Sequence, residues 1–233
     1  AALAGVIVLG AREGRFGRRG EKRSMQPFAA SSIPLVTLGT FLLWFGWFGF
    51  NGFSQLAMGT FDDVNAISKI AVNTHLAGAA GTVTGAALTR LIGGKTDIVM
   101  MLNGALAGLV AITAEPLTPG PITAMIIGSI GAVIMYYGTK LLENLGLDDV
   151  VGAIPVHMFA GIFGTLVVPF TNSDTSFGTQ FVGVISVCVF SFVLSWITFS
   201  TLKSTVGLRI SKAAEKLGTD KAEVGVIAYS IRD

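Results

Sequence analysis

The sequence contains two histidines, and both stand where an ionisable side chain is unusual. His75 and His157 each lie near the middle of a long apolar stretch. A titratable group in such surroundings is costly and is often functional, and imidazole both donates and accepts protons near neutral pH. For His157 we predict a role in the passage of a small polar or proton-bearing solute. For His75 the preferred interpretation is a packed ring with a structural role.

An aromatic cluster precedes His75 in the chain. Trp47 and Phe50 are three residues apart, so they share one face of a helix. Ser54 follows one turn after Phe50 and adds a hydroxyl group. Aromatic rings along a pore can hold a cation on their faces or form a dry constriction. The alternative is a belt of aromatic residues at a membrane interface.

Two acidic pairs stand just before apolar stretches. Asp148 and Asp149 precede the stretch that contains His157, and Asp62 and Asp63 precede the stretch that contains His75. Acidic side chains at such positions cap the first turn of a helix and complement its dipole. We therefore predict a structural role for both pairs rather than ligand binding.

Motifs for other kinds of chemistry are absent from the sequence. It contains no G-x-x-x-x-G-K-[ST] nucleotide loop, no H-E-x-x-H zinc motif and no G-x-S-x-G nucleophile motif. Cys188 is the single cysteine, which excludes a cysteine-based metal cluster. We predict that the chain is not an enzyme and binds neither cofactor nor metal.

The composition is that of a membrane protein. Hydrophobic residues make up 52% of the 233 residues and charged residues 13%, whereas soluble domains carry about 25% charged residues. A spanning helix needs roughly 20 mainly apolar residues, and the runs here are continuously apolar rather than alternating as in a barrel. We predict an all-α, polytopic membrane helical bundle. Its six transmembrane helices cover residues 33–58, 64–92, 98–114, 122–142, 150–170 and 177–202.

The remaining segments complete the predicted organisation. Residues 1–10 are apolar, too short to span, and lack the basic region of a signal peptide, so we interpret them as the tail of a truncated transmembrane helix. Residues 11–32 form a basic cytoplasmic loop, residues 33–202 carry the six helices, and residues 203–233 form a cytoplasmic C-terminal tail. The chain is accordingly expected to be a C-terminal fragment of a longer membrane protein.

The positive charges predict the orientation of the bundle. With six alternating helices, every Lys and Arg except Lys69 falls on one side, and such residues stay on the cytoplasmic side. This distribution predicts a multi-pass protein of the cell membrane with a cytoplasmic C-terminus. It also explains the basic cluster at residues 12–23 without nucleic-acid binding.

Small residues recur at close spacing within the predicted helices. The pairs are Gly81 and Gly85, Gly104 and Gly108, and Gly161 and Gly164. Such residues let helix backbones approach one another closely in lipid. They predict a tightly packed bundle and indicate no particular chemistry.

Several of these motifs together resemble the ammonium transporter family (Amt/MEP/Rh). The matching strings are GWFGFN at 46–51, VNT at 72–74, LNGALAGLV at 102–110, Asp148 and Asp149 followed by Val156 and His157, and VGLR at 206–209. They follow the family's order across nearly the whole chain. The resemblance implies trimers of eleven-helix subunits with one pore each, built from two inverted repeats. The six predicted helices would then be the second repeat plus the final helix.

The resemblance also implies roles for individual residues. His157 resembles the second of two histidines in the middle of the pore, and Phe50 one of two gating phenylalanines. Ser54 resembles a serine of the outer recruitment site, while Trp47 and Leu43 resemble pore-lining residues. The implied mechanism is capture of ammonium at the outer mouth, passage of the phenylalanine constriction, and deprotonation or proton relay at the histidine. The partner residues in the family would lie outside this chain.

Regulation and alternative functions remain open at this point. Residues 218–229 follow a family pattern in which the tail couples subunits and helps to bind a PII signalling protein, but Val224 and Val226 replace its usual His and Glu. A membrane-bound ammonium sensor is one alternative to a transporter. A pore for another small neutral solute, such as carbon dioxide or water, is the other.

Overall fold

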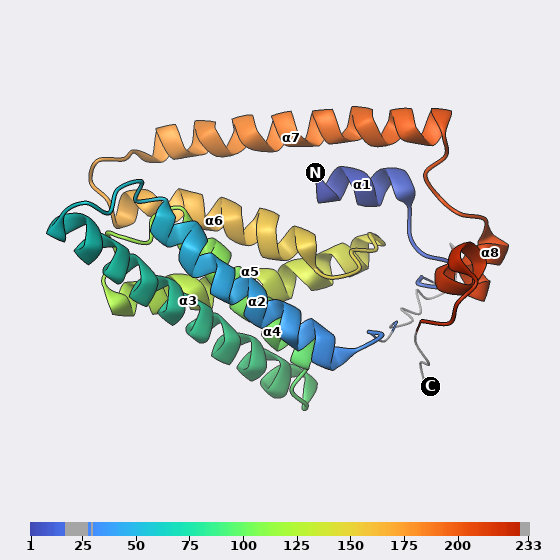
Figure 1. Ribbon diagram of the computed structural model, residues 1–233, viewed down its shortest axis with the longest axis horizontal. Helices are drawn as coiled ribbons and strands as arrows, with labels where there is room; N and C mark the ends of the chain where they lie inside the picture. Colours follow the sequence, from blue (N-terminus) through green and yellow to red (C-terminus); the bar gives the residue numbers. More distant parts are fainter. Residues whose placement is uncertain (17–27, 29, 229–233) are drawn as a thin grey trace. The chain divides into compact units, whose positions relative to one another are not determined.

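The computed structural model describes residues 1–16, 28 and 30–228. The regular elements of this part of the chain are all helices, which confirms the predicted all-α fold (Figure 1). The chain divides into two compact units. One contains Ala1–Ser32, Leu141–Val150 and Cys188–Asp233, and the other contains Ile33–Lys140 and Val151–Val187.

The larger unit carries the residues predicted to act on a solute. Its elements are α2 (Ile33–Phe53), α3 (Phe61–Gly93), α4 (Ile98–Thr113), most of α5 (Pro121–Leu145), η1 (Ile154–Phe159), α6 (Ala160–Val167), η2 (Val168–Phe170) and the first part of α7 (Phe177–Thr205). Here α3 packs along α4, and α2 contacts both of them (Figure 1). The smaller unit contains α1 (Ala2–Leu9), the ends of α5 and α7, α8 (Lys212–Leu217) and η3 (Asp220–Val224).

Local signals in the sequence set the ends of α3. The Thr60 hydroxyl accepts a hydrogen bond from the backbone N–H of Asp63, and the Asp63 carboxylate accepts one from the backbone N–H of Thr60. This reciprocal capping box satisfies donors at the start of the helix and confirms the capping role predicted for Asp63. At the other end, Gly94 takes a left-handed conformation with φ 75° and donates to the Arg90 carbonyl, as glycine commonly does at helix C-termini.

Glycines bring α3 and α4 into backbone contact. A Cβ added to Gly81 would collide with the carbonyl oxygen of Gly104, and a Cβ on Gly108 would collide with that of Ala77. A Cβ on Gly85 would stand 2.9 Å from the Met100 carbonyl oxygen. The close packing predicted for the first two glycine pairs is therefore confirmed. It keeps the two helices nearer than any larger side chain would allow.

The core of the larger unit lies between α3, α4, α5 and α6. Ala77, Ala111, Ile112, Ala124 and Ile127 form one buried cluster, and Phe163 and Val167 pack against it. Ala107, Met135, Val156 and Ala160 form a second cluster that joins α4 and α5 to the helical turn around His157. This second cluster anchors the segment that carries the histidine.

The apolar helices agree only in part with the predicted spans. Within the described residues, α2, α5 and α7 are long and apolar enough to cross a membrane, whereas Ile98–Thr113 and Ile154–Phe170 are shorter apolar segments. The 33-residue α3 carries more polar residues, among them Lys69 and His75. The apolar window of α2, like that of α7, is only 6% buried, so most of the apolar surface of both helices is exposed on the chain. The number of spanning helices stays a prediction.

Candidate functional site

One face of α2 carries most of the predicted site residues. Leu43, Trp47, Phe50 and Ser54 are spaced by four, three and four residues, so they follow one side of the helix. The Trp47 and Phe50 rings meet edge to face with centroids 6.2 Å apart. Phe50 is 65% exposed and Leu43 53% exposed. These residues thus share one side of α2 and of the turn that follows it, where Leu43, Phe50 and Ser54 are exposed and Trp47 is half-buried.

The hydroxyl of Ser54 is oriented by the end of α2. Its Oγ donates a hydrogen bond to the Phe50 carbonyl oxygen at 2.7 Å. A hydroxyl that gives its own proton to a neighbour presents only lone pairs to a ligand. Phe50 and Ser54 also line a shallow hollow of about 510 Å³ together with Gly46, Gly49, Phe53 and Leu56. The hollow therefore offers a hydroxyl acceptor beside exposed aromatic rings.

The Trp47 indole is held by α4. Its Nε1 donates to Thr113 Oγ1 at 2.7 Å, and the Thr113 hydroxyl donates in turn to the Leu109 carbonyl at 2.6 Å. This pair of bonds gives the indole a single hydrogen-bonded orientation. A partner is expected for any buried indole N–H, so the pore-lining role of Trp47 stays a prediction.

Two asparagines of the matched strings have structural roles that sequence reasoning missed. Asn51 is 1% exposed, and its Nδ2 donates to the buried Thr74 hydroxyl at 3.0 Å, which ties α2 to α3. Asn103 Nδ2 donates to the Val151 carbonyl at 3.0 Å and so holds the segment before η1 against α4. Polar amides within apolar helices were the available signal, because a buried amide needs a partner.

His157 lies in a helical turn of unusual geometry. Residues Ile154–Phe159 form a π-helix, and the Pro155 carbonyl accepts from the N–H of Ala160 five residues later. Val156 and Ala160 are buried in the second core cluster, while the His157 residue is exposed. Turns of this kind frequently occur at functional sites. The π-turn thus anchors its apolar residues in the core and leaves the imidazole at the surface of the chain.

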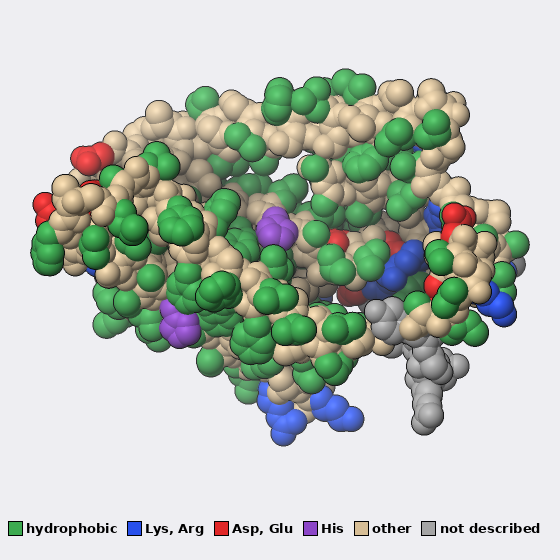
Figure 2. Space-filling view, viewed as in Figure 1, with side chains coloured by type: hydrophobic (Ala, Val, Ile, Leu, Met, Phe, Trp, Pro, Cys, Tyr) green, Lys and Arg blue, Asp and Glu red, His purple; other side chains and the backbone are tan. Residues whose placement is uncertain are grey.

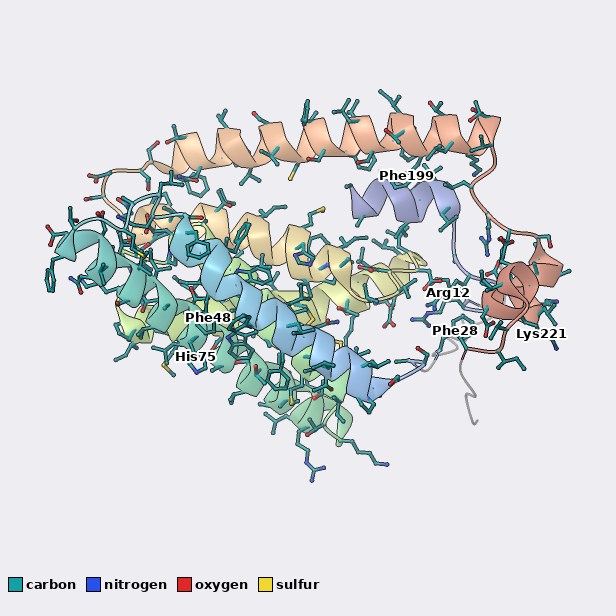
Figure 3. All side chains as sticks on the ribbon, in the orientation of Figure 1. Arg12, Phe28, Phe48, His75, Phe199 and Lys221 are labelled. Carbon is teal, nitrogen blue, oxygen red and sulfur yellow. The ribbon has the colours of Figure 1, made fainter. Side chains whose placement is uncertain are left out.

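His75 belongs to a different surface. It is exposed on α3, its ring stacks on Phe48 with centroids 6.2 Å apart, and it lies 5.5 Å from the Trp44 ring (Figure 3). Figure 2 shows the two histidines as separate purple patches. Trp44 and Phe48 occupy another side of α2 from Trp47 and Phe50. The structural role preferred for His75 stays a prediction.

The capping role predicted for Asp148 is wrong. Arg12 donates to its carboxylate from the backbone N, Nε and Nη2 at 2.8–2.9 Å, and Arg15 Nε lies 3.5 Å away. The helix after it begins only with η1, whose N-cap Ala153 has no side-chain cap. Burial opposes ionisation of Asp148, but the bonds and charges of the two arginines outweigh it, so the pKa of this carboxyl lies below its usual value. Asp148 therefore joins the segment after α1 to the segment after α5.

The C-terminal tail is also connected by charged groups within the smaller unit. The Glu215 carboxylate accepts from the backbone N–H of Glu13 at 2.7 Å and from Arg209 Nη2 at 2.8 Å. The Glu13 N–H and the Arg209 guanidinium lower the pKa of Glu215. Val224 ends η3 and Val226 follows Gly225, and both valines are exposed. Tyr229, Arg18, Arg19, Lys22 and Arg23 lie outside the described residues.

Comparison with protein families identifies the chain's relatives. The model of the Ammonium Transporter Family matches residues 1–229. The chain is 39% identical to ammonium transporter Amt2 of Archaeoglobus fulgidus over 98% of its own length and 52% of that protein. It is 34% identical to ammonium transporter Amt1 of Haloferax mediterranei over 98% of its length and 46% of that protein. The chain thus spans about half the length of these relatives.

Solved structures of Amt and Mep proteins share the fold of this chain. A protein described as a sensor Amt protein superposes with a TM-score of 0.86 at 33% identity, covering 95% of this chain and 56% of that one. Candida albicans Mep2 superposes with a TM-score of 0.77 at 27% identity, covering 96% of this chain and 52% of that one. These relatives are transporters and related membrane proteins rather than enzymes, and the predicted resemblance is confirmed. The chain belongs to the ammonium transporter family.

Proposed function

We propose that this chain forms part of a protein that carries ammonium or ammonia across the cell membrane. The observation that supports this most directly is the arrangement on α2, where the Trp47 and Phe50 rings meet at 6.2 Å beside the Ser54 hydroxyl. Ring faces and a hydroxyl lone pair suit a small cation that donates hydrogen bonds. The choice of ammonium as the substrate rests on relatives that are named ammonium transporters.

The outer part of the path would be the hollow around Phe50 and Ser54. An ammonium ion here exchanges part of its hydration shell for the Ser54 oxygen and the aromatic faces. Phe50 then acts as a dry constriction next to Trp47 and Leu43, beyond which a bare cation is costly because burying an unpaired charge is unfavourable. This cost favours loss of the proton before further passage.

His157 is proposed as the group that handles this proton in the middle of the membrane. Its π-turn is anchored by Val156 and Ala160 and leaves the ring exposed on the chain. Imidazole is suited to accept and return a proton near neutral pH. Deprotonation of ammonium at this ring, or relay of its proton, would let ammonia cross an apolar path.

The remaining parts of the proposal concern the surroundings of this chain. Because the chain spans about half the length of its relatives, we propose that further protein covers the exposed face of α2 and completes the pore. A homotrimer, a cytoplasmic C-terminus and a PII signalling protein at the cytoplasmic face belong to the same proposal. Exposed Val224 and Val226, in place of His and Glu, leave the PII contact without two polar groups.

Uptake measurements test the proposed transport. Cells without their own ammonium transporters would express the intact gene product that contains these residues, and uptake of labelled methylammonium would be followed with and without competing ammonium. We expect saturable uptake that ammonium inhibits, and a strong reduction by Phe50→Ala. Phe45→Ala is the matched control, because Phe45 is 77% exposed on another side of α2. Equal uptake by both variants would contradict the role of Phe50.

The second candidate function is ammonium sensing. It is favoured by the structural relative described as a sensor Amt protein, which is 33% identical over 95% of this chain. A sensor would bind ammonium but give no uptake above background in the same cells. A pore for carbon dioxide or water would give solute flux that competing ammonium does not inhibit.

A further inference from the structure

A second hollow lies at the end of the larger unit opposite Ser54. It measures about 590 Å³ and is lined by the start of α2, the turn between α3 and α4, and the last part of α5 within this unit. Its polar lining includes Lys95, Thr96, Tyr136 and Lys140, and its apolar wall includes Ile33 and Ile98. The transport path proposed above uses none of these residues.

The lining of the hollow is net positive, because it contains two lysines and one carboxylate, Asp97. In the part of the chain that the structure describes, neither Lys95 nor Lys140 forms an ion pair with a carboxylate. Asp97 also lines the hollow, but its Oδ1 accepts from the N–H of Met100 and caps α4. Arg90 adds a further cation at the same turn, where its Nη1 donates to the Gly94 carbonyl at 2.6 Å. Figure 2 shows basic side chains gathered where α3 turns into α4.

Two of the polar groups are held in place for a ligand. Lys140 Nζ lies 4.3 Å from the centroid of the Tyr136 ring, a cation–π contact that keeps the ammonium group over the ring. Tyr136 is 4% exposed, so its ring is fixed by the core. The turn that carries Lys95 and Thr96 is itself anchored, because the backbone N–H of Asp97 donates to the Thr89 hydroxyl. The Lys140 ammonium group and the turn that carries Lys95 are therefore held by neighbouring side chains.

From this arrangement we propose that the hollow binds the phosphate head group of an anionic phospholipid. Lys95 and Lys140 would face the phosphate, the Tyr136 and Thr96 hydroxyls would donate to its oxygens, and Ile33 and Ile98 would contact the glycerol and the first acyl carbons. Basic pockets between transmembrane helices on the cytoplasmic side suit such head groups, since the cytoplasmic leaflet carries the anionic lipids. The cytoplasmic location of the hollow rests on the membrane orientation in the proposed function, whereas the phosphate binding rests on the residues of the hollow alone.

The apolar wall favours a lipid over a soluble phosphate ester. Ile98 lines the hollow and is 47% exposed, and a soluble phosphate would leave that apolar surface in contact with water. A phospholipid covers it with hydrocarbon while its charge stays with the lysines. A phospholipid and a soluble phosphate ester both offer the phosphate group, and a binding measurement can distinguish them.

Native mass spectrometry of the purified intact protein tests the proposal. Phosphatidylglycerol, phosphatidylcholine and glycerol 3-phosphate would be titrated separately in a non-ionic detergent. We expect phosphatidylglycerol to bind preferentially, and Lys95→Gln and Lys140→Gln each to weaken it roughly fivefold. Tyr136→Phe, which keeps the ring and removes the hydroxyl, should weaken it roughly two- to tenfold. Lys69→Gln is the matched control, because it removes the same charge from an exposed site of α3 outside the hollow.

Several results would overturn the proposal. If phosphatidylcholine bound as well as phosphatidylglycerol, binding would not depend on the lipid's charge. If Lys69→Gln weakened binding as much as Lys95→Gln, the attraction would be a nonspecific effect of protein charge. Competition by glycerol 3-phosphate at the lipid's own concentration would assign the hollow to a soluble phosphate ester instead. Lys95 is exposed in a turn, so Lys95→Gln keeps the test valid even if a change at Lys140 disturbs folding. Lipid binding is read without transport, so its failure leaves the proposed function standing.

Discussion

Trp47 and Thr113 are joined by a hydrogen bond from the indole Nε1 to Oγ1 at 2.7 Å. Trp47 lies on α2 and Thr113 is the last residue of α4. The bond therefore connects the aromatic face of α2 to a neighbouring helix 66 residues later in the chain. The Trp47 ring, which lies beside Phe50, is therefore oriented by a bond to another helix rather than by a residue of α2.

This bond should be measurable as a coupling between the two side chains. Trp47→Phe and Thr113→Val each remove it, and we expect each to lower the free energy of unfolding by about 0.5–1.5 kcal/mol beyond the change in packing. In the double variant the second substitution should cost less than it does alone, because the bond is already absent. Thermal unfolding in detergent measures all four proteins of this cycle. Strictly additive losses would show that the bond contributes nothing.

The contact between α3 and α4 should tolerate no side chain at Gly81. Gly81→Ala gains up to about 1 kcal/mol of helix propensity, but its Cβ meets the Gly104 backbone, which cannot rotate away. Overpacking typically costs about 1–3 kcal/mol, so we expect net destabilisation and a lower midpoint of thermal unfolding. Gly93→Ala is the control on the same helix, because nothing lies within 4 Å of its Cβ position. A Gly81→Ala protein as stable as the Gly93→Ala protein would contradict the packing.

The bonds of Arg12 to Asp148 should make stability depend on pH in the acid range. The pKa of Asp148 is lower in the folded chain than its ordinary value of 3.8. The ionised carboxylate therefore contributes stability that is complete above the ordinary pKa and is lost as pH falls towards the folded-state pKa. Asp148→Asn should cost about 1–3 kcal/mol near neutral pH, and this difference should shrink below about pH 4.

A pH series of unfolding measurements checks this expectation. Asp174→Asn is a suitable control, since Asp174 is an exposed carboxylate in the loop before α7, and it should leave the stability nearly unchanged. A difference between the native protein and Asp148→Asn that stays constant from pH 3 to pH 7 would rule out the charged contact as its source.

The two histidines should differ in their effect on transport. His157→Ala in the intact gene product should lower methylammonium uptake roughly tenfold or more, or change its selectivity, because the proposed proton acceptor is lost. His75→Ala removes a ring packed on Phe48 and Trp44, so it should reduce stability by about 1 kcal/mol while uptake per folded molecule persists. Unaltered uptake and selectivity in His157→Ala, at normal protein levels, would remove His157 from the mechanism.

The sequence predicted the first residues of three helices correctly. The predicted stretches begin at residues 33, 98 and 177, and α2, α4 and α7 begin there. The predicted end of the first stretch at 58 is five residues too late, because the chain turns after Phe53 and Leu56 takes a left-handed conformation with φ 61°. A run of apolar residues does not reveal such a turn when the residue in the turn is itself apolar.

The sequence by itself determined the helical class, the pairs of closely spaced glycines and the common face of Trp47, Phe50 and Ser54. These properties depend on composition and on spacing within one helix, which every sequence displays directly. Only the tertiary structure decided that Asp148 binds Arg12, that Thr113 holds Trp47 and that His157 sits in a π-turn. The first two depend on which distant segments meet, and the path of the chain is set by the sum of many packing contacts rather than by any local pattern.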